Sequence, residues 1–362
     1  MAGYPILLAY FPWRRLPPVR KDPTARRTVT VLMAVYNGES FLRQKLDSLL
    51  ALDYPKNLLE ILVISDGSTD RTDEIATEYA AAGVRLLRVP RGGKATALNI
   101  GIAQAHGDIL FFTDVRQRLA PDSLQHLIAC LADPTVGCVT GELHILSDST
   151  GAEAGMSLYW RYEIWARGKL SLIDSMCGAT GCIYAMRRDL AKPLPPDTLL
   201  DDIALPLGAF FQGYRLILDP EAKAYDLPSP MGSEFSRHVR TLAGVWQLLV
   251  RFPELLGSCD RMRLHFLSHK FGRLLMPYAV LAAVASSFAL PDPCRALALM
   301  AIAAAVALAL LDLLTPEGWS LKRVTSAFRT LLVMQAASLC SCSVFFVPAQ
   351  RLWKQTRVRE TG

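Results

Sequence analysis

The stretch Val29-Thr-Val-Leu-Met-Ala-Val-Tyr-Asn-Gly38 decides how this chain folds. Seven residues rich in β-branched side chains run into a turn, and a helical pattern follows with Leu42, Leu46 and Leu49 on one face. A strand that leads through a turn into a helix is the repeating unit of α/β sheets with right-handed crossovers. The stretch therefore predicts that an α/β domain begins here.

The same unit recurs downstream. Short apolar runs predict three further strands, over residues 59–65, 84–89 and 108–113, and residues 94–105 form a helical pattern. A polar or glycine-rich motif follows each run: Ser65-Asp-Gly-Ser-Thr-Asp70, Gly92-Gly-Lys-Ala95 and Thr113-Asp114. Open α/β sheets bind their ligands at the carboxyl ends of their strands. These motifs are therefore expected to meet in one binding site.

The C-terminal third of the chain is unusually apolar. Of the 362 residues, 51% are hydrophobic, and three nearly uninterrupted runs, 271–290, 296–314 and 331–347, account for the excess. Each is close to the ~20 residues that span a bilayer as a helix. They predict transmembrane helices within residues 271–349, ahead of a basic tail at 350–362. The alternative is a buried helical hairpin in a soluble domain.

Residues 1–27 combine a short apolar segment with a basic, proline-containing linker. The segment is too short to span a membrane and carries no convincing signal-peptide cleavage site, so it lies along the interface or ends a longer helix. The linker and the net charge of +6 favour anionic lipid on the cytoplasmic side of a membrane. No nucleic-acid-binding motif is present, so nucleic acid is not an expected partner. All eight cysteines are interpreted as reduced.

Taken in order, these motifs resemble the family 2 glycosyltransferases, inverting enzymes with a GT-A fold. The C-terminal half resembles the membrane-bound synthase branch of that family, which includes cellulose, chitin, hyaluronan and poly-N-acetylglucosamine synthases. The resemblance covers nearly the whole chain. It implies an α/β, GT-A (Rossmann-like) nucleotide-sugar-binding domain over residues 28–250, an interfacial linker over 251–270, and transmembrane helices after it.

Two residues are expected to hold the sugar donor. The resemblance makes Asp66 the acceptor of hydrogen bonds from the nucleotide base; the alternative is an Asx-turn residue that caps the next helix. Lys94 follows two glycines at the start of a helix, where the ammonium and the free N–H groups can meet an anion. The resemblance makes that anion the donor's diphosphate. A solvated surface lysine is the alternative.

The metal site of the family is incomplete in this sequence. Asp114 matches the first position of the family's Asp-x-Asp, but Arg116 occupies the second. Mg²⁺ or Mn²⁺ can still bind through one carboxylate together with substrate phosphates and waters. Arg116 can instead give the diphosphate a fixed positive charge, or it is a surface arginine.

The acceptor side is expected in two further segments. The resemblance places Gly178, Ala179 and Thr180 beneath the sugars, although a tight turn into a buried strand explains them equally well. An inverting transfer needs a carboxylate to take the proton of the attacking hydroxyl. Asp202 aligns with the family's catalytic aspartate; the alternative is that it and Asp201 only cap a helix.

Residues 234–247 resemble the Gln-x-x-Arg-Trp element of the synthases. Arg240 and Gln247 hold matching places, and Arg237, three residues before Arg240, can join it in binding the leaving diphosphate. Gln247 is expected on the acceptor side. Thr241 stands where processive synthases carry the tryptophan that stacks on the acceptor sugar, which puts processivity in question. The alternative is an amphipathic helix at the membrane interface.

These observations predict an inverting glycosyltransferase of the inner (plasma) membrane, multi-pass, with a cytoplasmic catalytic domain. Its donor is expected to be a nucleoside-diphosphate sugar, with a UDP-sugar favoured, and its acceptor a polysaccharide or a lipid-linked glycan. Two alternatives stay open: transfer of a single sugar to polyprenyl phosphate, and a non-catalytic donor-binding or assembly subunit.

Overall fold

The chain forms two compact units, Met1–Pro228 and Ser229–Gly362. The structure, a computed structural model, describes residues 3–11, 16–146, 158–227, 234–257, 261–316 and 318–352. The first unit holds an eight-stranded sheet with helices on both faces. In the described residues, the second unit is helical throughout.

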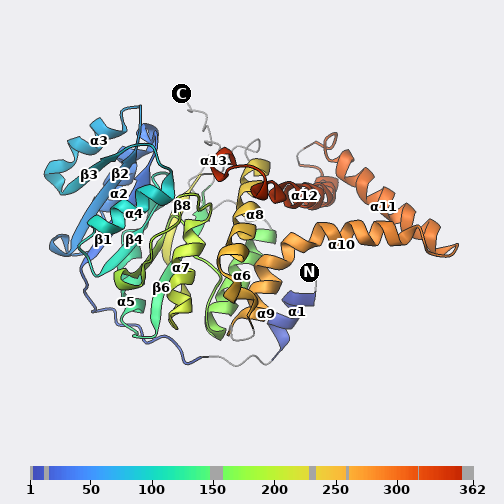
Figure 1. Ribbon diagram of the computed structural model, residues 1–362, viewed down its shortest axis with the longest axis horizontal. Coiled ribbons are helices and arrows are strands. Elements are labelled where there is room, and N and C mark those ends of the chain that lie inside the picture. The colour runs from blue at the N-terminus through green and yellow to red at the C-terminus, as the bar shows by residue number, and fades with distance from the viewer. Residues whose placement is uncertain are drawn as a thin grey trace. The chain divides into compact units, whose positions relative to one another are not determined.

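Four parallel strands form the first half of the sheet (Figure 1). They are β1 (Val29–Val35), β2 (Leu59–Asp66), β3 (Val84–Val89) and β4 (Ile109–Phe112), in the order β3-β2-β1-β4. All four predicted strands are confirmed, two of them with the predicted ends. Local apolar runs are sufficient to mark β1, β2 and β4, because most of their residues are buried on both faces of the sheet, whereas the edge strand β3 is only partly buried.

The second half of the sheet has mixed directions. It contains β5 (Arg118–Leu119), β6 (Val136–Ile145), β7 (Tyr184–Arg187) and β8 (Arg215–Asp226). Strand β7 pairs antiparallel with β4 and with β6, β8 pairs parallel with β6, and β5 pairs antiparallel with β8. The complete order is β3-β2-β1-β4-β7-β6-β8-β5.

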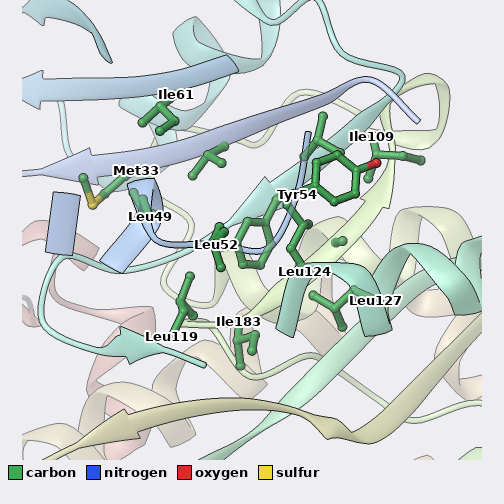
Figure 2. Packing of buried hydrophobic residues seen from close by; sticks show 14 of the residues in the cluster. Met33, Leu49, Leu52, Tyr54, Ile61, Ile109, Leu119, Leu124, Leu127 and Ile183 are labelled. Atoms are coloured by element: carbon green, nitrogen blue, oxygen red, sulfur yellow. The ribbon is translucent and has the colours of Figure 1, made fainter. Parts of the chain in front are cut away.

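Alternate residues of β1 pack on opposite faces of the sheet. Val31 and Met33 belong to the core formed with α2 (Glu39–Leu50) and α5 (Ser123–Leu131). Figure 2 shows this packing, with Leu49 and Leu124 among the labelled residues. On the other face α4 (Lys94–Gln104) packs on β1 and β2. A Cβ at Gly101 of α4 would lie 2.9 Å from Cδ1 of Ile64, so only glycine allows this close approach.

The other helices of the first unit surround the sheet. They are α1 (Gly3–Tyr10), α3 (Thr72–Glu78), α6 (Leu158–Ile173) and α7 (Asp201–Phe211), with short 3₁₀ turns at Lys56–Leu58, Ala80–Ala82 and Arg188–Leu190. Helix α3 packs on β3, and α7 packs on β6 and β8. Helix α1 packs on α6.

The basic linker is attached to the first unit. Lys21 forms an ion pair with the buried Asp219 at 3.0 Å, and the Asp22 amide donates to the carbonyl of Ala129. The Arg27 amide donates to the hydroxyl of Tyr54 at 2.9 Å. At least one of the charges expected to face lipid therefore neutralises a buried carboxylate instead. Arg14 and Arg15 lie outside the described residues.

The second unit consists of helices. Its elements are α8 (Glu234–Arg251), a 3₁₀ turn (Pro253–Leu256), α9 (Arg263–Phe266), a π-helical turn (Leu267–Phe271), α10 (Gly272–Ser287), α11 (Cys294–Leu311), α12 (Ser320–Ser341), a 3₁₀ turn (Cys342–Phe345) and α13 (Ala349–Leu352). Helix α8 packs on α12. Trp246 of α8 donates to Oγ of Ser341 at 3.2 Å, and its ring meets the edge of Phe345.

Two helical segments of the described chain are long and apolar enough to cross a membrane by length and composition, Cys294–Leu311 and Ser320–Phe345. Within the described residues, only 6% and 17% of their most apolar windows are buried. The predicted run at 271–290 forms α10, which is not one of these two segments. Membrane crossing by the second unit therefore stays a proposal.

Candidate active site

Asp66, the last residue of β2, is buried and binds the loop that follows β3. Its carboxylate accepts hydrogen bonds from the amides of Gly92, at 2.7 Å, and Gly93, at 3.0 Å, and forms an ion pair with Arg91. Gly67 makes this approach possible: its φ is +67°, and a Cβ there would lie 2.8 Å from the Arg91 amide nitrogen. Asp70, rather than Asp66, accepts from the Thr72 amide at the start of α3.

The same loop contributes a ring and a cation. The guanidinium of Arg91 lies over the ring of Tyr36, 3.7 Å from its centroid. Tyr36 follows β1, Asp66 ends β2 and Arg91 follows β3, so three adjacent parallel strands bring these groups together. The planar groups can stack on a nucleobase, and the carboxylate beside them can accept hydrogen bonds from the N–H groups of that base.

Lys94 links two carboxylates at the start of α4. Its Nζ lies 2.9 Å from Oδ1 of Asp114, which follows β4, and 3.1 Å from Oδ2 of Asp201, the first residue of α7. Burial alone would lower the pKa of Lys94, but the charges of Asp114 and Asp201 outweigh it and raise that pKa above its ordinary value. Lys94 is therefore a fixed cation within the site and not a solvated surface lysine.

Asp202 lies next to the Gly178–Gly181 turn. A Cβ at Gly181 would lie 3.3 Å from Oδ2 of Asp202. The turn is joined to α7 because the Ala179 amide donates to the Asp202 carbonyl at 2.8 Å. Within a regular helix that carbonyl would accept from residue 206, but Pro206 has no N–H. The proline thus leaves the Asp202 carbonyl available to hold the turn.

Arg167 of α6 holds the same turn from the other side. It donates to Oγ1 of Thr180 at 2.9 Å and to the carbonyl of Gly178 at 3.2 Å. The Thr180 amide donates to Oγ1 of Thr140 on β6. A Cβ at Gly178 would lie 2.6 Å from Cγ1 of Ile203, so the turn packs tightly on α7. The turn geometry fits both interpretations of this segment, a sugar contact and a tight turn.

Arg116 is bound to a carboxylate from another strand. It forms an ion pair with Asp226, the last residue of β8, and Nε2 of Gln117 donates to the same carboxylate at 2.8 Å. The Asp226 side chain is 4% exposed and that of Arg116 is 25% exposed. Arg116 is therefore neither a solvated arginine nor an unengaged cation, and its planar fork is anchored at the rim of the site.

Asp114 is the candidate ligand for a divalent metal. No group of three or more His, Cys, Asp or Glu side chains suited to a metal occurs in the part of the chain that the structure describes. Asp114 nevertheless keeps a 38% exposed carboxylate beside Lys94. One carboxylate completed by phosphates and waters is a usual arrangement for Mg²⁺, so the residues fit a metal that arrives with the donor.

Three predicted residues lie in the second unit. Arg237, Arg240 and Gln247 belong to α8, and their role at the donor and acceptor stays a prediction. Sequence reasoning missed Arg91, Tyr36, Arg167, Asp226 and the buried Lys45. The signal for Lys45 was present, because it follows Leu42 by three residues and precedes Leu49 by four, on the apolar face of α2. For Asp226 there was no local signal.

Comparisons with known proteins find glycosyltransferases that are similar to this chain. Residues 30–194 match the profile of the family described as Glycosyl transferase family 2. A probable glycosyltransferase of Bacillus subtilis, YdaM, is 26% identical over 269 residues, which are 70% of this chain and 63% of that protein. The poly-beta-1,6-N-acetyl-D-glucosamine synthase of Staphylococcus aureus is 28% identical over 234 residues, 62% of this chain and 56% of that protein. The chain thus spans less than two thirds of these relatives.

One solved structure is similar over almost the whole chain. The mannosyltransferase PcManGT from Pyrobaculum calidifontis, in complex with GDP-Man and Mn²⁺, is 25% identical, with a TM-score of 0.74 over 95% of both chains. The mixed sheet is therefore a GT-A-like fold. Residues 30–194 thus carry the match to the family 2 glycosyltransferases, and they do so within a GT-A-like fold.

Proposed function

We propose that this protein is a glycosyltransferase that moves a sugar from a nucleoside-diphosphate sugar to a glycan or lipid-linked acceptor at a membrane, with inversion at the anomeric carbon. The observation that carries the proposal is the ion-pair row Asp114–Lys94–Asp201, with Asp202 placed beside the turn that ends at Gly181. A fixed cation and a nearby carboxylate are what a leaving diphosphate and an attacking hydroxyl need.

The donor's base is assigned to the cluster of Tyr36, Asp66 and Arg91. Asp66 supplies a carboxylate acceptor, and the stacked Arg91 and Tyr36 supply planar faces. The sequence resemblance favours a UDP-sugar, whereas the similar mannosyltransferase is described in complex with GDP-Man. Both donors share the diphosphate. The proposed donor is therefore a nucleoside-diphosphate sugar, and an assay with several such donors separates the members of this class.

Asp202 is assigned as the general base. It accepts the proton of the acceptor hydroxyl as that oxygen bonds to the anomeric carbon, and the bond from the anomeric carbon to the diphosphate oxygen breaks. The electron pair of the broken bond leaves with the nucleoside diphosphate. Lys94 stabilises the charge that develops there, because its neighbouring carboxylates keep it protonated. Arg116, held at the rim by Asp226, is assigned to the same diphosphate.

Asp114 is assigned as the protein ligand of a divalent metal that binds together with the donor. When bound, Mg²⁺ or Mn²⁺ would neutralise diphosphate charge as a Lewis acid. The presence of Mn²⁺ in the similar mannosyltransferase structure supports the assignment. Lys94 and Arg116 already bring two positive charges to the same side of the site. Removing the metal is expected to weaken donor binding, whereas the position of Asp202 should stay the same.

Membrane association is assigned to the second unit. Its two candidate spans keep most of their apolar surface unburied, as a lipid-facing helix does. Exposed apolar side chains include Leu297, Met300 and Leu331, each more than half exposed. Arg237, Arg240 and Gln247 of α8 are retained as proposed diphosphate and acceptor contacts. A multi-pass inner-membrane enzyme with a cytoplasmic catalytic unit remains the proposed location.

The test is release of nucleoside diphosphate by the detergent-purified full chain. The panel contains GDP-mannose, UDP-N-acetylglucosamine and UDP-glucose, each with Mn²⁺, Mg²⁺ or EDTA, and with lipid extract as the source of acceptor. We expect release from one donor, dependence on lipid extract, and a strong decrease in EDTA. No release from any donor, together with no binding of UDP or GDP, would contradict the proposal.

A second candidate is transfer of one sugar to polyprenyl phosphate. Thr241 favours it, because the side chain that stacks on a growing polymer in processive synthases is missing there. Trp246 does not replace it, since its indole is bonded to Ser341 and packs on Phe345 within the second unit. Product analysis separates the two candidates: a single glycolipid species supports this one, and a ladder of lengths supports polymerisation.

A further inference from the structure

Lys45 is a fully buried cation beneath the donor site. Its side chain rises from the apolar face of α2 and is 1% exposed. Its Nζ donates to Oγ1 of Thr113 at 2.6 Å and to the carbonyl oxygen of Gln117 at 2.7 Å. Both acceptors are neutral. No carboxylate in the described ranges lies within ion-pair distance of this ammonium.

The two acceptors mark the ends of one loop. Thr113 and Gln117 enclose Asp114 and Arg116, which are the residues assigned to the metal and the diphosphate. The hydroxyl of Thr113 in turn donates to the carbonyl of Cys182 at 2.8 Å, on the chain segment that leads into β7. Gln117 also donates to Asp226. A single ammonium therefore joins both ends of the donor loop to α2.

Keeping such a group is costly. Removing a charge from water costs several kcal/mol, and neutral acceptors recover only part of that cost. A methionine would fill the same volume without the cost. Burial without a counter-ion thus disfavours Lys45 as a device for stability. What the ammonium provides, and an apolar side chain cannot, is two hydrogen bonds to one loop and a positive potential under it.

We propose that Lys45 is a positioning residue for donor binding, whose ammonium holds the Thr113–Gln117 loop so that Asp114 and Arg116 meet the diphosphate together. This inference rests on the function proposed above. Lys45 is too deeply buried to touch the donor itself, so it acts through the loop. Its removal should therefore weaken binding of the diphosphate while leaving the fold intact.

The experiment compares Lys45→Met with the wild-type full chain in detergent, using UDP and GDP with MnCl₂ as probes in isothermal titration calorimetry. We expect Lys45→Met to bind the better of the two nucleoside diphosphates at least tenfold more weakly, and to unfold at a temperature no lower than the wild type. A lysine with only a structural role would change in the opposite way, losing thermal stability while binding is unchanged.

Lys56→Met is the matched control. Lys56 also donates to backbone carbonyls, but to those of Leu50 and Leu52 at the end of α2 and not to those of the Thr113–Gln117 loop. It is expected to lose some stability and to bind the diphosphate normally. Should Lys45→Met not fold, Thr113→Val replaces it, because that change removes one of the two loop contacts while Lys45 remains. It is expected to weaken binding in the same direction.

Wild-type affinity in Lys45→Met, or in Thr113→Val if that variant is the one tested, would overturn the inference. If the wild-type chain itself bound neither UDP nor GDP, the proposed function would be overturned and the inference with it. The wild-type titration therefore distinguishes failure of the proposed function from failure of the role given to Lys45.

Discussion

Asp201 and Asp202 are neighbours in the chain, yet their carboxylates serve different parts of the site. Successive residues of a helix are rotated by about 100° around its axis, so the two side chains cannot share a direction. Asp201 binds Lys94 at 3.1 Å, and Asp202 lies against the turn at Gly181. One acid therefore holds the cation, and its neighbour is placed for proton transfer.

This separation predicts different kinetic effects for two equivalent substitutions. Asp202→Asn should lower kcat by about 10² or more, since a general base contributes on the order of 10²–10⁴. Asp201→Asn should mainly raise the KM for the donor, because Lys94 loses one of its two carboxylates. Steady-state nucleoside-diphosphate release measures both. If Asp202→Asn retained full kcat, the assignment of the base would be wrong.

The burial of Lys45 leads us to expect that the free energy of unfolding depends on pH. Burial lowers the pKa of Lys45 from 10.5 to about 8, so the folded protein loses this proton before the unfolded chain does. Between pH 8 and 10.5 the unfolded state binds more protons, and stability rises with pH. The gain from this one group is about 3 kcal/mol, at ~1.4 kcal/mol per pH unit. Below pH 8 Lys45 is charged in both the folded and the unfolded state, so its burial destabilises the folded protein by the full amount.

Other groups titrate in the same pH range, so the effect of Lys45 is measured as the difference in stability between the wild type and Lys45→Met. Thermal unfolding of wild type and Lys45→Met is compared at pH 7, 8.5 and 10. Lys45→Met should be the more stable of the two at pH 7, and its advantage should shrink steadily toward pH 10. A difference that does not change with pH would show that Lys45 titrates alike in the folded and unfolded states.

At the scale of elements, turns at the ends of strands position the groups of the candidate site. The turn after β2 brings the Arg91 loop onto Asp66, and the turn before β7 brings Gly181 onto Asp202. Each turn is possible because a glycine or a proline removes an atom that would interfere: Cβ at Gly67, and the N–H of Pro206. The binding motifs are thus also packing motifs.

Gly67→Ala and Gly83→Ala form a matched pair that tests this view. Both glycines have a positive φ, but a Cβ at Gly83 meets nothing within 4 Å, whereas one at Gly67 meets the Arg91 backbone at 2.8 Å. Gly83→Ala should cost about 1 kcal/mol from backbone strain alone. Gly67→Ala should cost more, about 2–3 kcal/mol, and should also weaken donor binding. Thermal unfolding measures the difference, and equal costs would contradict the close approach.

At the scale of the whole molecule, an α/β unit and a helical unit contain different parts of the proposed function. The first contains the family match and every site contact described above. The second carries the candidate spans and the α8 residues assigned to the diphosphate and acceptor. An acceptor in or on lipid would explain why one chain joins an α/β unit to helices with unburied apolar surface.

Met300→Arg tests whether α11 enters the bilayer. Met300 lies near the middle of α11 and is 58% exposed within its unit. An arginine at the centre of a spanning helix costs about 2.5–3.5 kcal/mol, whereas on a water-exposed helix it costs almost nothing. We expect less protein in carbonate-washed membranes. Leu256→Arg, also on an exposed apolar residue but outside both spans, is the control and should fractionate as the wild type does.

Much of the first unit was readable from the sequence because its signals are local. The runs at 29–35 and 84–89 predicted β1 and β3 with their ends, and each predicted motif lies where its strand finishes. The order of β4, β7, β6 and β8 was not predicted. Pairing of Phe112 with Tyr184 joins residues far apart in the chain, and no short window of sequence records it.

The sequence by itself determined the family resemblance, the parallel half of the sheet and the acidic and basic residues at its edge. Periodicity and turn chemistry act over a few residues, so they can be read without knowing the fold. Only the tertiary structure decided which charges meet: Asp226 with Arg116, Lys94 with Asp201, and Lys45 with the donor loop. Such pairs join segments distant in the chain, and their strength depends on burial and distance, which arise only when the strands pair.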